Sequence, residues 1–191
     1  MIRTFAICCT STLLAFSTAV ASAEDLVGKA APSFELKGVD GKTYKLDDYK
    51  GKIVVLEWAN KDCPVWRGVL DELNATYEKY ATNQISETTD VKKPEIIWLA
   101  VDSTNNLNAN DVTDFCKTNK ITRPVLDDSE GKVGQSFKAR TTPHMFIINT
   151  DGKVVYDGAI DNKKKGDEHV NYVAKALDEL KAGKDVSEAS T

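Results

Sequence analysis

The 191-residue chain lacks several features by which common classes of protein are recognised. Its 25 Lys and Arg residues are outnumbered by 29 Asp and Glu residues, so it has no basic field and we expect no nucleic-acid binding. It has two histidines, and a site joining His144 to Cys63 would have too few ligands, so we expect no metal and no other cofactor. Beyond residue 23 no apolar run approaches the length of a membrane span, and we expect no stable membrane insertion.

The longest apolar run lies at the start of the chain and has the form of a secretory signal peptide. Arg3 supplies the positive charge, residues 5–20 are mostly apolar, and Ala21-Ser22-Ala23 is a small-residue cleavage site. A membrane anchor is the alternative, but Thr and Ser residues interrupt a run that is already short for a span. We therefore predict cleavage after Ala23, export to a bacterial periplasm, and a mature chain, residues 24–191, that forms one domain.

Cysteine is scarce once this leader is set aside. Of the four cysteines, two lie in residues 1–23, so Cys63 and Cys116 are the pair that the mature chain retains. Two cysteines allow one disulfide bridge, or one catalytic thiol with one buried bystander. A chain of this length needs no disulfide framework to hold its core, so each cysteine is first considered as a reactive thiol.

Hydrophobic patterning predicts a sheet. Alternating residues 33–46 with Asp40-Gly41 at their centre predict an N-terminal β-hairpin, and residues 145–148 and 154–159 around Asp151-Gly152 predict a second hairpin. Short apolar runs at 53–58 and 95–101 are typical of buried strands. Residues 124–126 are predicted to form a short strand or an extended link.

Helical spacing appears in four places. Apolar residues spaced by three and four predict helices at 64–80, 111–119, 132–139 and 168–181, the last ending before Gly183. Residues 187–191 carry no such pattern and are expected to fray.

Cys63 stands where the strand at 53–58 gives way to the helix that follows. Backbone N–H groups at a helix start are unpaired and favour negative charge, so a thiol there is shifted toward the nucleophilic thiolate. Pro64 is tolerated in a first helical turn, and Arg67 adds positive charge one turn on, while Asp62 opposes the thiolate. Cys63 is therefore our candidate nucleophile, against the alternative of a small buried side chain.

The segment EW-N--CP-R around Cys63, together with TTPHMFIINTDGKVVYDGAID, resembles the redoxin-type proteins of the thioredoxin-like superfamily. These are grouped with the alkyl hydroperoxide reductase/thiol-specific antioxidant proteins, and the resemblance covers residues 26–186. It implies an α/β thioredoxin-like sandwich, with a central mixed β-sheet flanked by helices and an N-terminal β-hairpin. It also implies that Thr142-Pro143 is a cis-proline loop lying against the redox cysteine, where an ordinary trans proline is the alternative.

Two departures from related families bear on the reaction. Trp66 stands where thioredoxin-like oxidoreductases carry the second cysteine of Cys-x-x-Cys, so no local disulfide can close. Cys116 resembles the resolving cysteine of atypical thiol peroxidases, but a buried core thiol is the favoured interpretation. Compared with peroxiredoxins, Asn60 replaces a threonine, and Pro143 stands at their arginine position, with Arg140 and Arg67 as nearby guanidinium groups.

These features predict an exported thiol-dependent oxidoreductase that acts through Cys63 on a thiol, disulfide or peroxide substrate. An external thiol reductant, or Cys116 as possible resolving residue, would regenerate it. We expect Asn60, Pro64, Trp66, Arg67, Thr142 and Pro143 to support the site. A peroxiredoxin-like peroxidase with antioxidant activity is the second hypothesis, and a module that binds polypeptides or thiols without turnover is the third.

Overall fold

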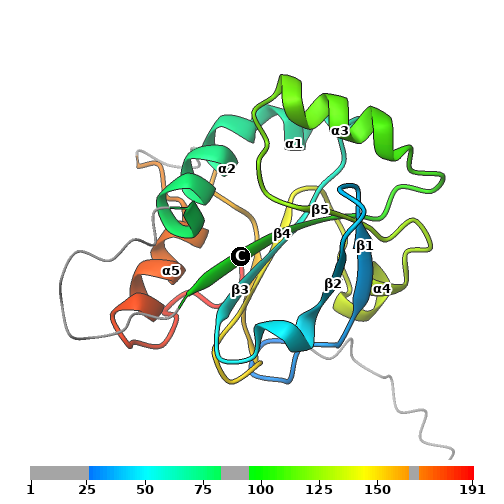
Figure 1. The fold of residues 1–191 in the computed structure, drawn as a ribbon. Helices are drawn as coiled ribbons and strands as arrows, with labels where there is room; N and C mark the ends of the chain where they lie inside the picture. Colours follow the sequence, from blue (N-terminus) through cyan, green and yellow to red (C-terminus); the bar gives the residue numbers. More distant parts are fainter. Residues whose placement is uncertain (1–25, 83–94, 164–167) are drawn as a thin grey trace, which may run out of the picture.

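The computed structural model describes residues 26–82, 95–163 and 168–191. The predicted signal peptide and its cleavage site lie outside the described residues. Within them, no helix is both long enough and apolar enough to cross a membrane. The fold is a seven-stranded mixed sheet with helices on both faces (Figure 1), which confirms the predicted α/β thioredoxin-like sandwich.

The strands follow the order β2-β1-β5-β4-β3-β6-β7 across the sheet. Their bounds are β1 Glu35–Gly38, β2 Thr43–Lys45, β3 Ile53–Trp58, β4 Ile96–Asp102, β5 Val125–Asp127, β6 His144–Ile148 and β7 Val154–Gly158. β4 runs parallel to β3 and β5, and every other neighbouring pair is antiparallel. Both predicted hairpins, β1–β2 and β6–β7, are confirmed.

The helical elements are α1 Pro64–Gly68, α2 Leu70–Tyr77, α3 Ala109–Thr118, α4 Lys132–Phe137 and α5 Tyr172–Lys181, with short helical turns at Leu46–Tyr49 and Glu78–Thr82. Residues of α1, α2, α3 and α5 share one hydrophobic cluster on one face of the sheet. α4 packs into a second cluster on the opposite face, beside Phe34. Figure 1 shows α1 and α3 next to each other above one end of the sheet.

β3 lies inside the sheet, between β4 and β6, and is buried along its whole length. Ile53 and Val55 pack into the first cluster, whereas Val54, Leu56 and Trp58 pack into the second. A strand covered on both faces needs apolar residues at successive positions, which explains the continuous run in the sequence. This strand ends at Trp58, so the turn that leads to Cys63 begins at a fully buried element.

Two helix predictions were wrong in their bounds. The predicted helix 64–80 is broken at Val69, where φ −117° and ψ 12° lie outside the helical region, and it divides into α1 and α2. The last helix begins at Tyr172 and not near residue 168, because the Asn171 side chain caps it by accepting a hydrogen bond from the Ala174 N–H at 2.8 Å.

The predicted fraying of residues 187–191 was also wrong. Asp157 on β7 donates its N–H to the Ala189 carbonyl at 3.0 Å, and Ser190 forms a parallel bridge with Asp157. The Thr191 hydroxyl lies 2.8 Å from the Tyr156 hydroxyl and accepts from the Ala159 N–H at 2.9 Å. Backbone and hydroxyl hydrogen bonds hold this segment on β7, and hydrophobic periodicity carries no signal for such contacts.

Candidate functional site

Cys63 is the N-cap residue of α1 and is half-buried. Its N–H donates to the Asn60 carbonyl at 3.0 Å, and its carbonyl accepts from the Arg67 N–H at 3.0 Å. The Asn60 side-chain oxygen accepts from the Asp62 N–H at 2.7 Å, so Asn60 shapes the turn that presents the cysteine. Pro64 occupies the first helical position, as expected.

The Thr142–Pro143 peptide bond is cis, as the resemblance implied. The cis-proline loop lies against the cysteine, since the Sγ of Cys63 is 3.3 Å from the Thr142 carbonyl oxygen. The two residues are 79 positions apart in the sequence and meet because β3 and β6 are paired side by side in the sheet. A backbone carbonyl beside the thiol marks a place where a substrate chain can be held next to the reacting sulfur.

The surroundings of Cys63 lower the pKa of its thiol from the ordinary value. Desolvation acts against this and raises the pKa, but the Thr142 side chain and the backbone N–H groups of Trp66 and Val65 favour the thiolate. The positive charge of Lys163 acts in the same direction. The net effect increases the fraction of Cys63 in the nucleophilic form.

The charged residues expected to tune Cys63 lie differently from the prediction. Arg67 stacks over the Phe115 ring, 5.6 Å from its centroid. Asp62 forms an ion pair with Lys61 at 2.9 Å, which offsets its expected opposition to the thiolate. Lys163, whose charge lowers the pKa of Cys63, was not predicted, and its place in a lysine-rich loop gave no sign of this in the sequence.

Trp66 does not line the site with its ring but anchors the helix to the core. Its indole N–H donates to Glu57 Oε1 at 2.7 Å, and the indole of Trp98 donates to Oε2 at 2.8 Å. The guanidinium of Arg123 donates to Oε1 at 2.9 Å through Nη2 and to Asn74 at 2.7 Å through Nη1. The Nε of Arg123 lies 2.6 Å from Oε2 but is poorly aligned for a hydrogen bond, so this contact is electrostatic.

Glu57 and Arg123 therefore form a buried ion pair directly beneath α1. Sequence reasoning did not identify it. The available signal was a lone glutamate inside the apolar run of β3, since buried charges in native folds are paired. The pair fixes Trp66, and through it the helix turn that surrounds Cys63.

Cys116 lies on α3 and is half-buried. It packs against the same hydrophobic cluster as Cys63, and neither cysteine forms a disulfide. Desolvation raises the pKa of its thiol, the charges of Glu57 and Asp102 add to this, and the charge of Arg123 opposes it. At neutral pH Cys116 is thus the less nucleophilic thiol of the two, and its neighbour Phe115 contacts Trp66 with ring centroids 5.9 Å apart.

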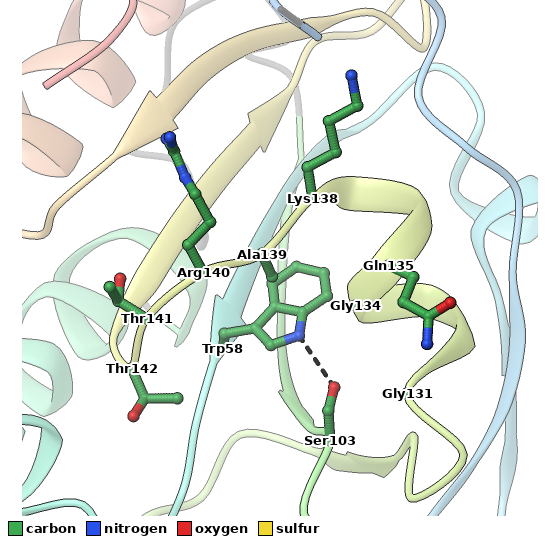
Figure 2. Close-up of a pocket in the computed structure, with 10 residues that line it drawn as sticks. All are labelled: Trp58, Ser103, Gly131, Gly134, Gln135, Lys138, Ala139, Arg140, Thr141 and Thr142. Carbon is green, nitrogen blue, oxygen red and sulfur yellow. Dashed lines mark hydrogen bonds between the residues drawn. The ribbon is translucent and has the colours of Figure 1, made fainter. Parts of the chain in front are cut away.

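A pocket of about 570 Å³ borders the cis-proline loop on the side of α4. Figure 2 shows the Trp58 indole at its centre, donating to the Ser103 hydroxyl at 3.1 Å, with Thr141 and Thr142 along one edge. Ser103 in turn donates to Asp128 at 2.7 Å, which fixes the wall of the pocket. Thr142 is the residue shared between this pocket and the contact with Cys63.

His144 follows the cis proline, and both of its ring nitrogens contact residues other than Cys63. Its Nδ1 accepts from the Arg140 N–H at 3.2 Å, so Nε2 carries the proton and donates to Asp157 at 2.6 Å. Both ring nitrogens are thereby used to hold residues 140–144 to β7. This pairing of His144 with Asp157 was not predicted, because the two residues are linked only through the register of the β6–β7 hairpin.

Known proteins resemble this chain in sequence. Thiol-disulfide oxidoreductase ResA of Bacillus thuringiensis subsp. konkukian (strain 97-27) is 30% identical over 131 residues, which cover 69% of this chain and 68% of ResA. Sporulation thiol-disulfide oxidoreductase A of Bacillus subtilis (strain 168) is 25% identical over 142 residues, covering 74% of this chain and 79% of that protein.

Among solved structures, an uncharacterized conserved protein from Geobacillus kaustophilus has a TM-score of 0.74 at 24% identity, covering 86% of this chain and 87% of that one. This likeness supports the fold alone. The model of the AhpC/TSA family matches residues 27–157, from the N-terminal segment to the second hairpin. That match includes Cys63, the cis-proline loop and every strand except the last residue of β7, and on this basis the chain belongs to the AhpC/TSA family.

Proposed function

We propose that this protein is a thiol–disulfide oxidoreductase whose nucleophile is Cys63. The observation that carries the proposal is the place of Cys63 at the N-cap of α1, with its sulfur 3.3 Å from the Thr142 carbonyl of the cis-proline loop. The names of the relatives, ResA and sporulation thiol-disulfide oxidoreductase A, support the same class of reaction. Val65, next to the cysteine, is 45% exposed and offers an apolar contact for a polypeptide substrate.

The reaction begins with the Cys63 thiolate attacking one sulfur of a substrate disulfide. The substrate S–S bond breaks, a mixed disulfide forms on Cys63, and the other substrate sulfur leaves as a thiolate that takes a proton from solvent. A second thiolate then attacks the mixed disulfide, becomes joined to the remaining substrate sulfur, and releases the Cys63 thiolate. The lowered pKa of Cys63 favours both its attack and its departure.

The second thiolate comes from an external thiol reductant in this proposal. Trp66 holds the place of a local resolving cysteine, and its ring is committed to Glu57 in the core. Cys116 is disfavoured because burial raises the pKa of its thiol. Its carbonyl also accepts the Ile121 N–H at 2.9 Å, so moving Cys116 toward Cys63 would break contacts at the end of α3.

The remaining site residues act by shaping the surroundings of the sulfur. Asn60 and Pro64 set the turn and the start of α1, and Thr142 and Pro143 present backbone to the substrate. Arg67, stacked on Phe115, helps to join α1 to α3 and does not polarise the sulfur. No cofactor takes part in this reaction, because both electrons are exchanged between sulfur atoms.

Peroxide reduction with an antioxidant role is the second candidate, favoured by the AhpC/TSA family assignment. In that reaction the thiolate attacks one peroxide oxygen, the O–O bond breaks, and sulfenic acid forms on Cys63 with release of water or an alcohol. The position of the peroxiredoxin arginine is held by Pro143, and the Arg67 guanidinium is engaged with Phe115. Neither residue is therefore placed as the peroxiredoxin arginine would be, which makes peroxide reduction the second candidate and not the first.

The product formed on Cys63 distinguishes these reactions. We expect reduced protein treated with a small disulfide to gain a mixed disulfide on Cys63, faster than equimolar hydrogen peroxide gives sulfenic acid there. Intact-mass and peptide mass spectrometry with a sulfenic acid trap measure both products. Faster reaction with peroxide would identify a peroxidase. A protein that binds a thiol-containing peptide but forms neither product would be a non-catalytic binding module.

We also propose that the protein is exported after removal of residues 1–23. The sequence of a positive residue, an apolar run and Ala21-Ser22-Ala23 motivates this. N-terminal sequencing of the mature protein, recovered from a periplasmic fraction, is expected to begin at Glu24. Recovery of mature protein that retains Met1 would refute the cleavage, and with it the periplasmic location.

A further inference from the structure

A cluster of three metal-ligating side chains lies apart from Cys63. It joins Glu72 on α2, Asp161 in the connection after β7, and His169 before α5. One ligand atom from each residue lies within 4.8 Å of the other two. Each residue comes from a different segment, so it is the tertiary fold, and not local sequence, that brings the three together.

The ligand atoms face a common point. The Nε2 of His169 lies 3.2 Å from Glu72 Oε2 and 3.5 Å from Asp161 Oδ2. A single nitrogen thus faces one oxygen from each of two carboxylates. Separations of this order are those of ligand atoms placed around one dication at about 2.0–2.2 Å.

The outer oxygen of each carboxylate is held by another group. The Asn171 side chain donates to Glu72 Oε1 at 2.8 Å, and also to the Thr76 hydroxyl at 2.9 Å. The Lys163 N–H donates to Asp161 Oδ1 at 3.0 Å. Such supporting hydrogen bonds orient metal ligands in known sites, because they fix which oxygen of a carboxylate is presented to the ion.

The buried carboxylate of Asp161 gives an independent indication of a cation. Its side chain is only 7% exposed and its Oδ2 points into the cluster. The ring nitrogen Nε2 of His169 lies 3.5 Å from this oxygen, the outer limit of a hydrogen bond. A carboxylate oxygen so deeply buried, facing a second carboxylate, needs a closer positive partner.

We propose that Glu72, Asp161 and His169 bind a transition-metal dication of the Zn²⁺ class. Two oxygens and one imidazole nitrogen suit zinc, whereas magnesium and calcium prefer sites made of oxygen alone. Three protein ligands leave a position for water. The ion joins α2, which continues from the Cys63 helix, to the connection that carries Lys163 and to the start of α5. This inference does not depend on the proposed oxidoreductase activity.

The test is a calorimetric titration of metal-free protein with ZnCl₂, in a Cys63→Ser/Cys116→Ser background so that thiols do not contribute. One Zn²⁺ is expected to bind per chain, with at least tenfold weaker binding of MgCl₂ or CaCl₂. Glu72→Gln and His169→Gln are each expected to lower the Zn²⁺ affinity tenfold or more. Glu78→Gln, which changes an exposed carboxylate directly after the last residue of α2, serves as the matched control and should leave the affinity unchanged.

Thermal unfolding with and without Zn²⁺ separates a binding defect from a folding defect. A variant that unfolds normally without metal, but is no longer stabilised by Zn²⁺, supports the site. The opposing explanation is that a protonated His169 bridges the two carboxylates without any metal. Absence of Zn²⁺ binding by the parent protein, or binding that is unchanged by both Glu72→Gln and His169→Gln, would overturn the proposal.

Discussion

Replacing Cys63 by serine is expected to reduce thiol–disulfide exchange to the uncatalysed rate. A serine hydroxyl cannot form the mixed disulfide, and the hydrogen bonds around residue 63 cannot supply a nucleophile in its place. The measurement is reduction of a small aromatic disulfide, followed by absorbance, with a monothiol as the external reductant. The circular dichroism of Cys63→Ser should match that of the parent, because a half-buried thiol is replaced by a side chain of similar size.

Cys116→Ser is the matched control for this loss. If an external thiol resolves the mixed disulfide, the variant should retain the parent rate within a factor of about two, because the Cys116 side chain then contributes only to packing. Exchange by the parent should level off at a lower pH than for a free cysteine, because the lowered pKa of Cys63 completes thiolate formation earlier. Loss of turnover in Cys116→Ser, with a Cys63–Cys116 disulfide in the oxidised parent, would show instead that Cys116 resolves the intermediate.

Removing the negative charge of Glu57 should cause a large loss of stability. In Glu57→Gln the guanidinium of Arg123 stays buried, with 3% of its surface exposed, but loses its counter-charge. Breaking a buried ion pair in this way destabilises proteins by about 3–5 kcal/mol. Urea unfolding followed by tryptophan fluorescence gives the free energy, and it also reports on Trp66 and Trp98, whose indoles donate to the same carboxylate.

An exposed ion pair provides the comparison. Glu35→Gln removes the partner of Lys45, which lies 2.9 Å away at the surface, and should change the free energy of unfolding by less than about 1 kcal/mol. A similarly small change in Glu57→Gln would mean that water or rearrangement compensates Arg123. That result would contradict the role of the Glu57–Arg123 ion pair in holding Trp66 in place.

The strands were predictable because their signals are local, and the proposal of Cys63 as nucleophile rests on a signal of the same kind, a cysteine at the start of a helix. β3 was predicted with its observed bounds, since a strand covered on both faces has a continuous apolar run. The hairpins followed from Asp40-Gly41 and Asp151-Gly152, and both glycines have positive φ, 81° and 76°. The cis bond before Pro143 was inferred from family resemblance, because no local pattern specifies it.

What escaped prediction depends on partners that are distant in the sequence. Arg123 lies 66 residues from Glu57, and their pairing is visible only once the sheet and α2 are assembled. Lys163 influences Cys63 across 100 positions, so the sequence pointed to the nearer Arg67 instead. The break at Val69 follows Gly68, whose weak helix propensity was a usable but overlooked signal.

The docked terminal segments have a consequence for association between molecules. β7 is the last strand of the sheet, and an unprotected last strand is a template for pairing with another chain. Here the Val154 N–H donates to the Lys29 carbonyl and the Asp157 N–H to the Ala189 carbonyl, both from segments outside the sheet. At these points the outer side of β7 is already hydrogen-bonded, which disfavours strand addition and aggregation there.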